Sequence, residues 1–166
     1  MKKQILKYIV IGLIIIASFY IGTLVGVTKT EYFAPKTGVE TIQNKTMLQL
    51  LNETRAKAGK PPLIEVLELD TSAKNKFYEM LAQKYWGHVN SGGVHGYEYA
   101  LKQFPMARTA SENLATCFTS ASEQNKGWEN SPLHYQAMIG DWDGVGFYTG
   151  KDYRGCWSTV SHFIKY

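Results

Sequence analysis

The chain has 166 residues, of which 45% are hydrophobic and 13% aromatic, and its formal net charge is +4. This apolar and aromatic content excludes a disordered chain and is enough for one packed domain. Four lysines before residue 30 account for the whole net charge, because the later residues carry 14 of the 18 basic side chains and all 14 acidic ones. They therefore have no basic excess of the kind that binds a nucleic-acid backbone, and we expect no nucleic-acid partner.

An uncharged apolar segment runs from Tyr8 to Thr28. About 20 such residues in a helix span the ~30 Å hydrocarbon layer of a membrane. Lys2, Lys3 and Lys7 precede the segment without any acidic residue, which places the N-terminus in the cytoplasm and the rest of the chain outside it. We expect residues 1–29 to form a basic flank and a single transmembrane anchor, giving a single-pass membrane protein.

A cleaved signal peptide is the rival interpretation of this segment, and it would give a secreted protein. The apolar core of a signal peptide is normally about 7–15 residues long, shorter than the segment here. The stretch SFYIGTLVG also offers only a poor cleavage site. A retained anchor is therefore favoured over cleavage.

Residues 30–45 are polar, contain Pro35 and Gly38, and show no sustained period, which indicates a short stalk. The domain proper is expected over residues 46–166. Its first helix is predicted from about Thr46, where leucines and a methionine supply an apolar side, and it ends before Gly59.

The pattern then predicts more helices, followed by strands. A helix is expected from Asp70, as N-cap, to about Tyr85, and the turn-forming stretch GHVNSGG ends it. The further elements are a short helix at 97–104, an extended ENLATCF segment, a helix at 132–139 with Pro132 as its first residue, and a terminal β-hairpin whose loop spans 150–155. Helices first and an antiparallel hairpin last indicate an α+β layered domain.

Cys117 and Cys156 are the two cysteines of the chain. Oxidising conditions outside the cytoplasm permit a disulfide between them, and two small buried thiols are the alternative. A bridge would close a loop of about 40 residues and stabilise the fold by roughly 3–4 kcal/mol.

Five sequence blocks, in this order, resemble the CAP superfamily: LDTSAKNKFYEM, YWGHVNSGG, ASENLA, GWENSPLHYQAMI and GVGFYTG. That group contains the cysteine-rich secretory proteins, antigen 5 and the plant pathogenesis-related proteins, and its domain is also called SCP. The similarity is greatest to short bacterial members and covers roughly residues 46–166. The resemblance implies an α-β-α sandwich with a central antiparallel sheet, and a cleft with two histidines and, in many members, two glutamates.

Matched residue by residue, the resemblance puts His88, Glu112 and His134 in the cleft. The second glutamate is open: many relatives have it three residues after the tryptophan, where this chain has Ser131, whereas Glu129 follows Trp128 directly. Two neutral imidazoles and a carboxylate suit zinc or another divalent cation, with water or a substrate in the remaining position. The plainer interpretation is that each residue serves its own segment, His88 as a helix-end hydrogen-bonding residue and Glu112 as a loop anchor.

Two further histidines, His95 and His162, match no family position, and we expect them to be a loop residue and a strand residue. The predicted function is a membrane-anchored extracytoplasmic binding module, because family members act mainly in binding. Several relatives bind lipids or sterols, and some bind divalent metal in the cleft, so a lipid, an envelope ligand or a protein is the expected partner.

The alternative function is a metal-dependent hydrolase or peptidase at the cell envelope, with Glu112 as general base for a water between His88 and His134. A serine variant of this chemistry would recruit Ser131. No nucleophile is visible beside a base in the sequence, however, which favours binding over turnover. A third hypothesis is structural: the cleft groups hydrogen-bond one another, and the surface recruits a protein.

Overall fold

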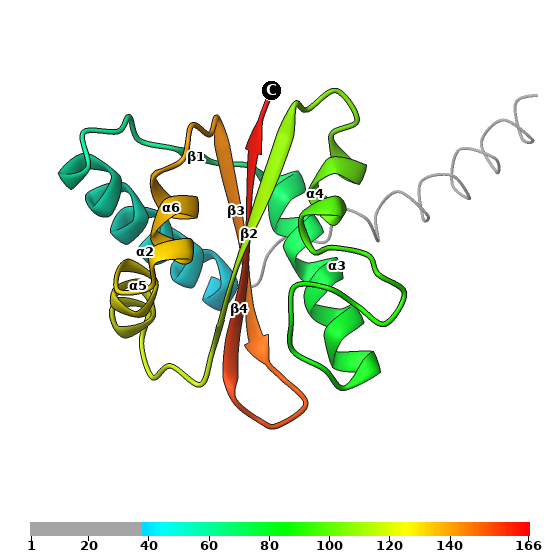
Figure 1. Cartoon of the computed structure of the whole chain (residues 1–166). Helices are drawn as coiled ribbons and strands as arrows, with labels where there is room; N and C mark the ends of the chain where they lie inside the picture. The colour runs from blue at the N-terminus through cyan, green and yellow to red at the C-terminus, as the bar shows by residue number, and fades with distance from the viewer. Residues whose placement is uncertain (1–37) are drawn as a thin grey trace, which may run out of the picture. The chain divides into compact units, whose positions relative to one another are not determined.

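The computed structural model describes the backbone of residues 38–166 and the side chains of residues 46–166. In chain order its elements are α2 (Gly38–Lys57), β1 (Ile64–Glu65), α3 (Leu67–Gln83), α4 (Tyr97–Gln103), β2 (Thr109–Thr116), α5 (Ala121–Glu129), α6 (Pro132–Ile139), β3 (Gly144–Lys151) and β4 (Trp157–Lys165). Figure 1 shows α2, α5 and α6 over one face of the sheet and α3 and α4 over the other. The predicted α+β class and its three layers are confirmed.

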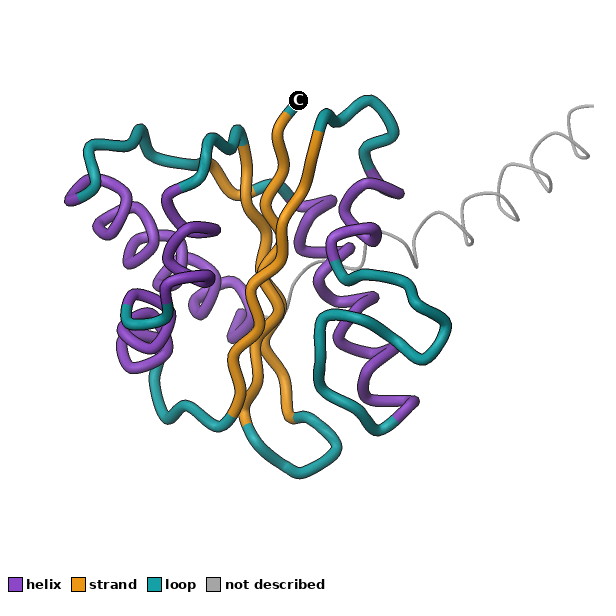
Figure 2. The backbone as a smooth tube through the Cα atoms, in the orientation of Figure 1, coloured by secondary structure: helices purple, strands orange, loops and turns teal. Residues whose placement is uncertain are grey.

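The four strands lie in the order β1-β3-β4-β2. The three long strands pair antiparallel, as predicted, and form the central band of Figure 2. The two-residue β1 differs from the prediction, because it pairs parallel to β3 at one edge. β2 forms the other edge of the sheet, and the candidate site is built on it.

Helix α2 begins at Gly38, inside the stretch predicted as stalk and eight residues before the predicted start at Thr46. No glycine or proline interrupts the chain between Gly38 and Gly59, so nothing in the sequence stops the helix from extending. Among residues 38–166 no helix has the length and apolar character needed to cross a membrane. The predicted anchor, residues 8–28, lies outside the described residues.

Helix α3 begins at Leu67, and the prediction that Asp70 caps it is wrong. Val66 is the N-cap residue, and Asp70 lies buried within the first turn. Its carboxylate accepts a hydrogen bond from the backbone N–H of Phe147 in β3, at 2.6 Å. A β-carbon at Gly146 would lie 2.3 Å from the Asp70 nitrogen, so the glycine is what allows α3 to pack directly on the strand.

Helix α6 begins at Pro132 as predicted, and Arg55 of α2 holds its other end. The Arg55 side chain is 1% exposed and donates to the carbonyl oxygens of Met138, at 2.7 Å, and Gly140, at 2.9 Å. These carbonyls belong to the last turn of the helix, where no intrahelical donor remains. Arg55 therefore fixes the position of α6 and, with it, that of His134.

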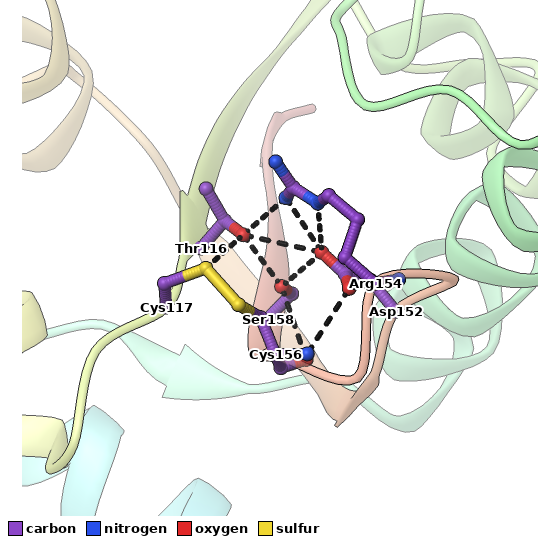
Figure 3. Close-up of polar contacts among 6 residues, drawn as sticks. All are labelled: Thr116, Cys117, Asp152, Arg154, Cys156 and Ser158. Atoms are coloured by element: carbon purple, nitrogen blue, oxygen red, sulfur yellow. Dashed lines mark hydrogen bonds and ion pairs between the residues drawn. A yellow bond between two sulfur atoms is a disulfide. The ribbon is translucent and has the colours of Figure 1, made fainter.

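The predicted disulfide between Cys117 and Cys156 is present, and it joins the end of β2 to the β3–β4 loop. Figure 3 shows that this loop is organised around the carboxylate of Asp152. Its partners are the Arg154 side chain and backbone N–H, the Cys156 backbone N–H, and the hydroxyls of Ser158 and Thr116.

Candidate functional site

His88 lies in the loop that follows α3, and a set of short hydrogen bonds fixes that loop. The Asn90 side-chain oxygen accepts from the backbone N–H groups of Gly92 and Val94, each at 2.9 Å. The Gly96 N–H donates to the His88 carbonyl oxygen at 2.7 Å, which closes the base of the loop. The His88 side chain is 51% exposed and faces solvent from this fixed base.

Glu112 lies in the middle of β2, and its side chain is only 2% exposed. One carboxylate oxygen is 2.8 Å from Nδ1 of His88, and the other is 3.1 Å from Nε2 of His162. The chain passes directly over this carboxylate at Gly96, where a β-carbon would lie 1.9 Å from Oε2. The backbone at Gly96 thus covers the Glu112 carboxylate, whose hydrogen-bond partners are the two imidazoles.

His162 is the functional residue that the sequence did not reveal. It lies opposite Glu112 in the β2–β4 register, is fully buried, and its Nδ1 is 2.7 Å from the hydroxyl oxygen of Ser72 in α3. We call Ser72, His162, Glu112 and His88 the histidine–glutamate chain, because their hydrogen bonds run from the buried face of α3 to the surface. A register between two strands is not visible in one sequence, which is why the role of His162 was missed.

The charge state of Glu112 follows from its two imidazoles. Burial alone raises the pKa of the Glu112 carboxyl, but the hydrogen bonds and charge of His162 and His88 outweigh burial and lower it below its usual value. The carboxylate is therefore ionised at neutral pH and can only accept hydrogen bonds. His88 must then donate through Nδ1, so a lone pair available to another group can only be on Nε2.

His134 reaches the same region from the opposite face of the sheet, on the first turn of α6 (Figure 1). Its ring centre is 6.3 Å from that of His88, and its Nδ1 is 2.8 Å from the Ser131 hydroxyl oxygen. The Asn113 side chain donates to the His134 carbonyl oxygen at 3.1 Å and ties this turn to β2. Burial, followed by the proximity of His88, lowers the pKa of His134, so the ring is neutral at neutral pH.

The structure brings His88, Glu112 and His134 together over the free edge of β2 but places Glu129 elsewhere. The Glu129 carboxylate accepts a hydrogen bond from the Thr54 hydroxyl of α2, at 2.5 Å. His95 lies in the exposed loop, as predicted, and it stacks on Tyr97. We use "the cleft" below for the region between His88 and His134.

The atoms in the cleft that could still coordinate a metal ion are two imidazole nitrogens, one from each histidine. Both Glu112 oxygens already bind imidazoles, and within residues 46–166 no group of three or more His, Cys, Asp or Glu side chains is arranged to hold a metal ion. Imidazoles that bind metals commonly have their second nitrogen held by a carboxylate or another polar group, as it is in His88 and His134. Two rings sharing a tetrahedral ion have centres ~5 Å apart, about 1 Å less than the 6.3 Å between His88 and His134.

A sequence profile of the cysteine-rich secretory protein family, CAP, matches residues 48–161. The chain belongs to the CAP family. Among curated proteins, no sequence is close enough to count as a match. The CAP domain here also matches several solved structures.

An outer surface protein of Borrelia burgdorferi is 24% identical, with a TM-score of 0.66, over 73% of this chain and 90% of that chain. An extracellular SCP-domain protein of Bacillus anthracis is 18% identical, with a TM-score of 0.67, over 80% of this chain and 45% of its own. NaASP2, solved with Zn²⁺, is 14% identical, with a TM-score of 0.54, over 78% of this chain and 82% of that chain. At these identities the likeness shows a shared CAP fold.

Proposed function

We propose that this protein is a membrane-anchored extracytoplasmic binding module whose cleft takes up a divalent cation, such as zinc, through Nε2 of His88 and His134. The observation that carries the proposal is the 2.8 Å hydrogen bond between Glu112 and Nδ1 of His88, since it fixes the ring with its other nitrogen free. The Zn²⁺ in the solved structure of NaASP2, a protein of similar fold, supports the choice of cation. The uncharged segment 8–28 would hold the module at the membrane and keep it close to envelope ligands.

In this proposal Glu112 is not a metal ligand. Its buried carboxylate binds both His88 and His162, so it acts through the histidine that it orients. The bound cation would keep water, or an atom of an envelope lipid or protein, in its remaining coordination positions.

The test is a cation titration of the full-length protein and two variants, His88→Ala and His134→Ala, by isothermal calorimetry with zinc. Each variant should lose the stoichiometric site while keeping the far-UV circular dichroism of the parent. His95→Ala is the matched control, because this exposed loop histidine stacks on Tyr97 outside the cleft. Zinc binding that survives in both cleft variants would overturn the assignment.

Acid should also release the cation, because a protonated imidazole cannot coordinate. The lowered pKa of His134 keeps that ring available below the ordinary histidine value of about 6.5.

A hydrolase is the second candidate, and one contact favours it. Ser131 Oγ lies 2.8 Å from Nδ1 of His134, a nucleophile within hydrogen-bond reach of a base. The metal-dependent version with Glu112 as general base is less compatible with the geometry, because both oxygens of that buried carboxylate are already bound. Covalent labelling of Ser131 by a fluorophosphonate, absent in Ser131→Ala, would establish the serine chemistry; an unlabelled parent would exclude it.

A further inference from the structure

A pocket of about 150 Å³ opens between α2, α5 and the β3–β4 hairpin, and none of the cleft residues lines it. Its wall includes two aromatic side chains, Phe118 and Trp157, and several hydroxyl and amide groups. No charged side chain lines the pocket, so it offers no counter-charge to a phosphate or carboxylate ligand. A cavity of this size holds one six-membered ring, as a benzene-binding cavity of about 150 Å³ does.

The polar groups of the pocket form one directed chain of hydrogen bonds. The Thr159 hydroxyl donates to Oε1 of Gln124 at 2.8 Å, so the Thr149 hydroxyl, also 2.8 Å away, must donate to Thr159. At the other end, Nε2 of Gln124 donates to the sulfur of Met47 at 3.7 Å. A thioether is a weak acceptor, so this amide, in a side chain only 6% exposed, is poorly satisfied.

The two ends of this series of hydrogen bonds determine which chemical groups of a ligand fit the pocket. Among residues 46–166, Thr149 presents an oxygen that can still accept a hydrogen bond, and Gln124 presents N–H groups without a strong acceptor. A group that both donates and accepts satisfies the two ends, and a hydroxyl is the simplest such group. The polar side of the pocket is therefore suited to a ring that carries hydroxyls.

The aromatic side is held in place and partly exposed, and Nζ of Lys151 lies over the Trp157 ring, 5.7 Å from its centre. Trp157 is 48% exposed, and its carbonyl oxygen accepts from the Cys117 N–H at 2.9 Å beside the disulfide. An indole of this kind binds the apolar face of a flat ring at little cost in conformational entropy. We propose that the pocket binds one pyranose ring of a neutral glycan, which stacks on Trp157 and hydrogen-bonds through its hydroxyls to Gln124 and Thr149.

The test is an NMR titration of the ¹⁵N-labelled full-length chain, in a detergent without a sugar headgroup, with methyl β-D-glucopyranoside and with N-acetyl-D-glucosamine. The Trp157 indole N–H and the Gln124 side-chain amide should shift on addition of at least one of the sugars. For a single ring we expect a Kd on the order of millimolar.

Variants separate stacking from hydrogen bonding. Trp157→Ala removes an exposed side chain and should weaken sugar binding by roughly tenfold. Gln124→Met keeps the side-chain size, removes the amide and should weaken binding by a similar factor. Tyr153→Ala is the matched control, because this exposed aromatic of the β3–β4 loop does not line the pocket, and the sugar affinity of this variant should equal that of the parent.

Absence of shifts with both sugars would overturn the proposal, and so would sugar binding that Trp157→Ala leaves unchanged. Sodium octanoate is the comparison ligand: if it binds more tightly than the sugars and Gln124→Met does not weaken it, the pocket takes an apolar chain instead. His88→Ala should leave the sugar titration unchanged, so this result is independent of the cation site.

Discussion

Two buried carboxylates, one in a strand and one in a loop, differ in their partners. Glu112, in β2, has one imidazole on each oxygen. Asp152, in the β3–β4 loop, binds a guanidinium, backbone N–H groups and hydroxyls (Figure 3). The partners of Glu112 are imidazole rings, each with a second nitrogen, whereas those of Asp152 are a permanently charged guanidinium and uncharged N–H and hydroxyl groups.

The two clusters are suited to different tasks. The Asp152 cluster fixes the shape of a loop, and the disulfide holds the same loop covalently. The histidine–glutamate chain fixes one nitrogen of His88 and leaves the other exposed, so it can bind a further group. Substitutions in the two clusters should therefore affect different properties: stability for the loop and cation affinity for the cleft.

The largest effect expected is that of removing the disulfide by Cys117→Ser together with Cys156→Ser. The bridge spans a sequence separation of 39 residues, for which the chain-entropy model gives a loss of roughly 4 kcal/mol in the free energy of unfolding. Urea denaturation followed by circular dichroism measures the loss. A loss below about 1 kcal/mol would mean that the hydrogen bonds of Asp152 hold the loop without the bridge.

Asp152→Asn should have the second-largest effect on the free energy of unfolding, and this effect depends on pH. Burial raises the pKa of Asp152, but hydrogen bonds from Arg154, Ser158 and Cys156 outweigh burial and lower this pKa to about 2, from an ordinary 3.8. A lowered folded-state pKa stabilises the fold above pH 3.8, by about 2 kcal/mol, and this stabilisation disappears as the pH falls through 2.

The measurement is the difference in unfolding free energy between parent and Asp152→Asn at several pH values. It should be constant from pH 7 to 5 and shrink below pH 4. A difference that persists at the lowest pH would show that the hydrogen-bond geometry, rather than the charge, stabilises the loop.

Glu112→Gln should mainly affect the cleft. An amide has one acceptor oxygen in place of two, so either His88 or His162 loses its acceptor. Loss of an outer partner of a metal-binding histidine weakens affinity by about 10–100-fold, and we expect the lower end because the second ligand, His134, is held separately by Ser131. Zinc calorimetry gives the value, and an unchanged affinity would argue that Glu112 does not orient His88.

The sequence predicts the helices and strands best where apolar spacing or a turn residue marks them. Pro132 marked the start of α6 and the Gly150–Gly155 stretch marked the hairpin, and both predictions are confirmed. Helix α5 was not predicted, because its buried residues include the polar side chains of Gln124 and Asn125, which no hydrophobic period reveals. Asp70 had the features of an N-cap, but packing of α3 against β3 gave it another partner.

The site could be predicted only in part, and the resemblance to CAP proteins supplied that part. His88, Glu112 and His134 are more than twenty residues apart in pairs, so no local spacing indicates that they meet. The contribution of His162 depends on the register of β4 against β2, and the covering of Glu112 depends on the close approach at Gly96. Both are consequences of packing, which one sequence does not display.

The smallest effect should be that of Glu129→Gln, the same chemical change as Glu112→Gln in a carboxylate outside the cleft. Glu129 contacts Thr54 of α2, and its amide counterpart can still accept that hydrogen bond. Zinc affinity should stay within about twofold of the parent, measured side by side with Glu112→Gln. If Glu129→Gln weakened zinc binding as much as Glu112→Gln does, the contrast between a carboxylate that orients a histidine and one that joins two helices would not hold.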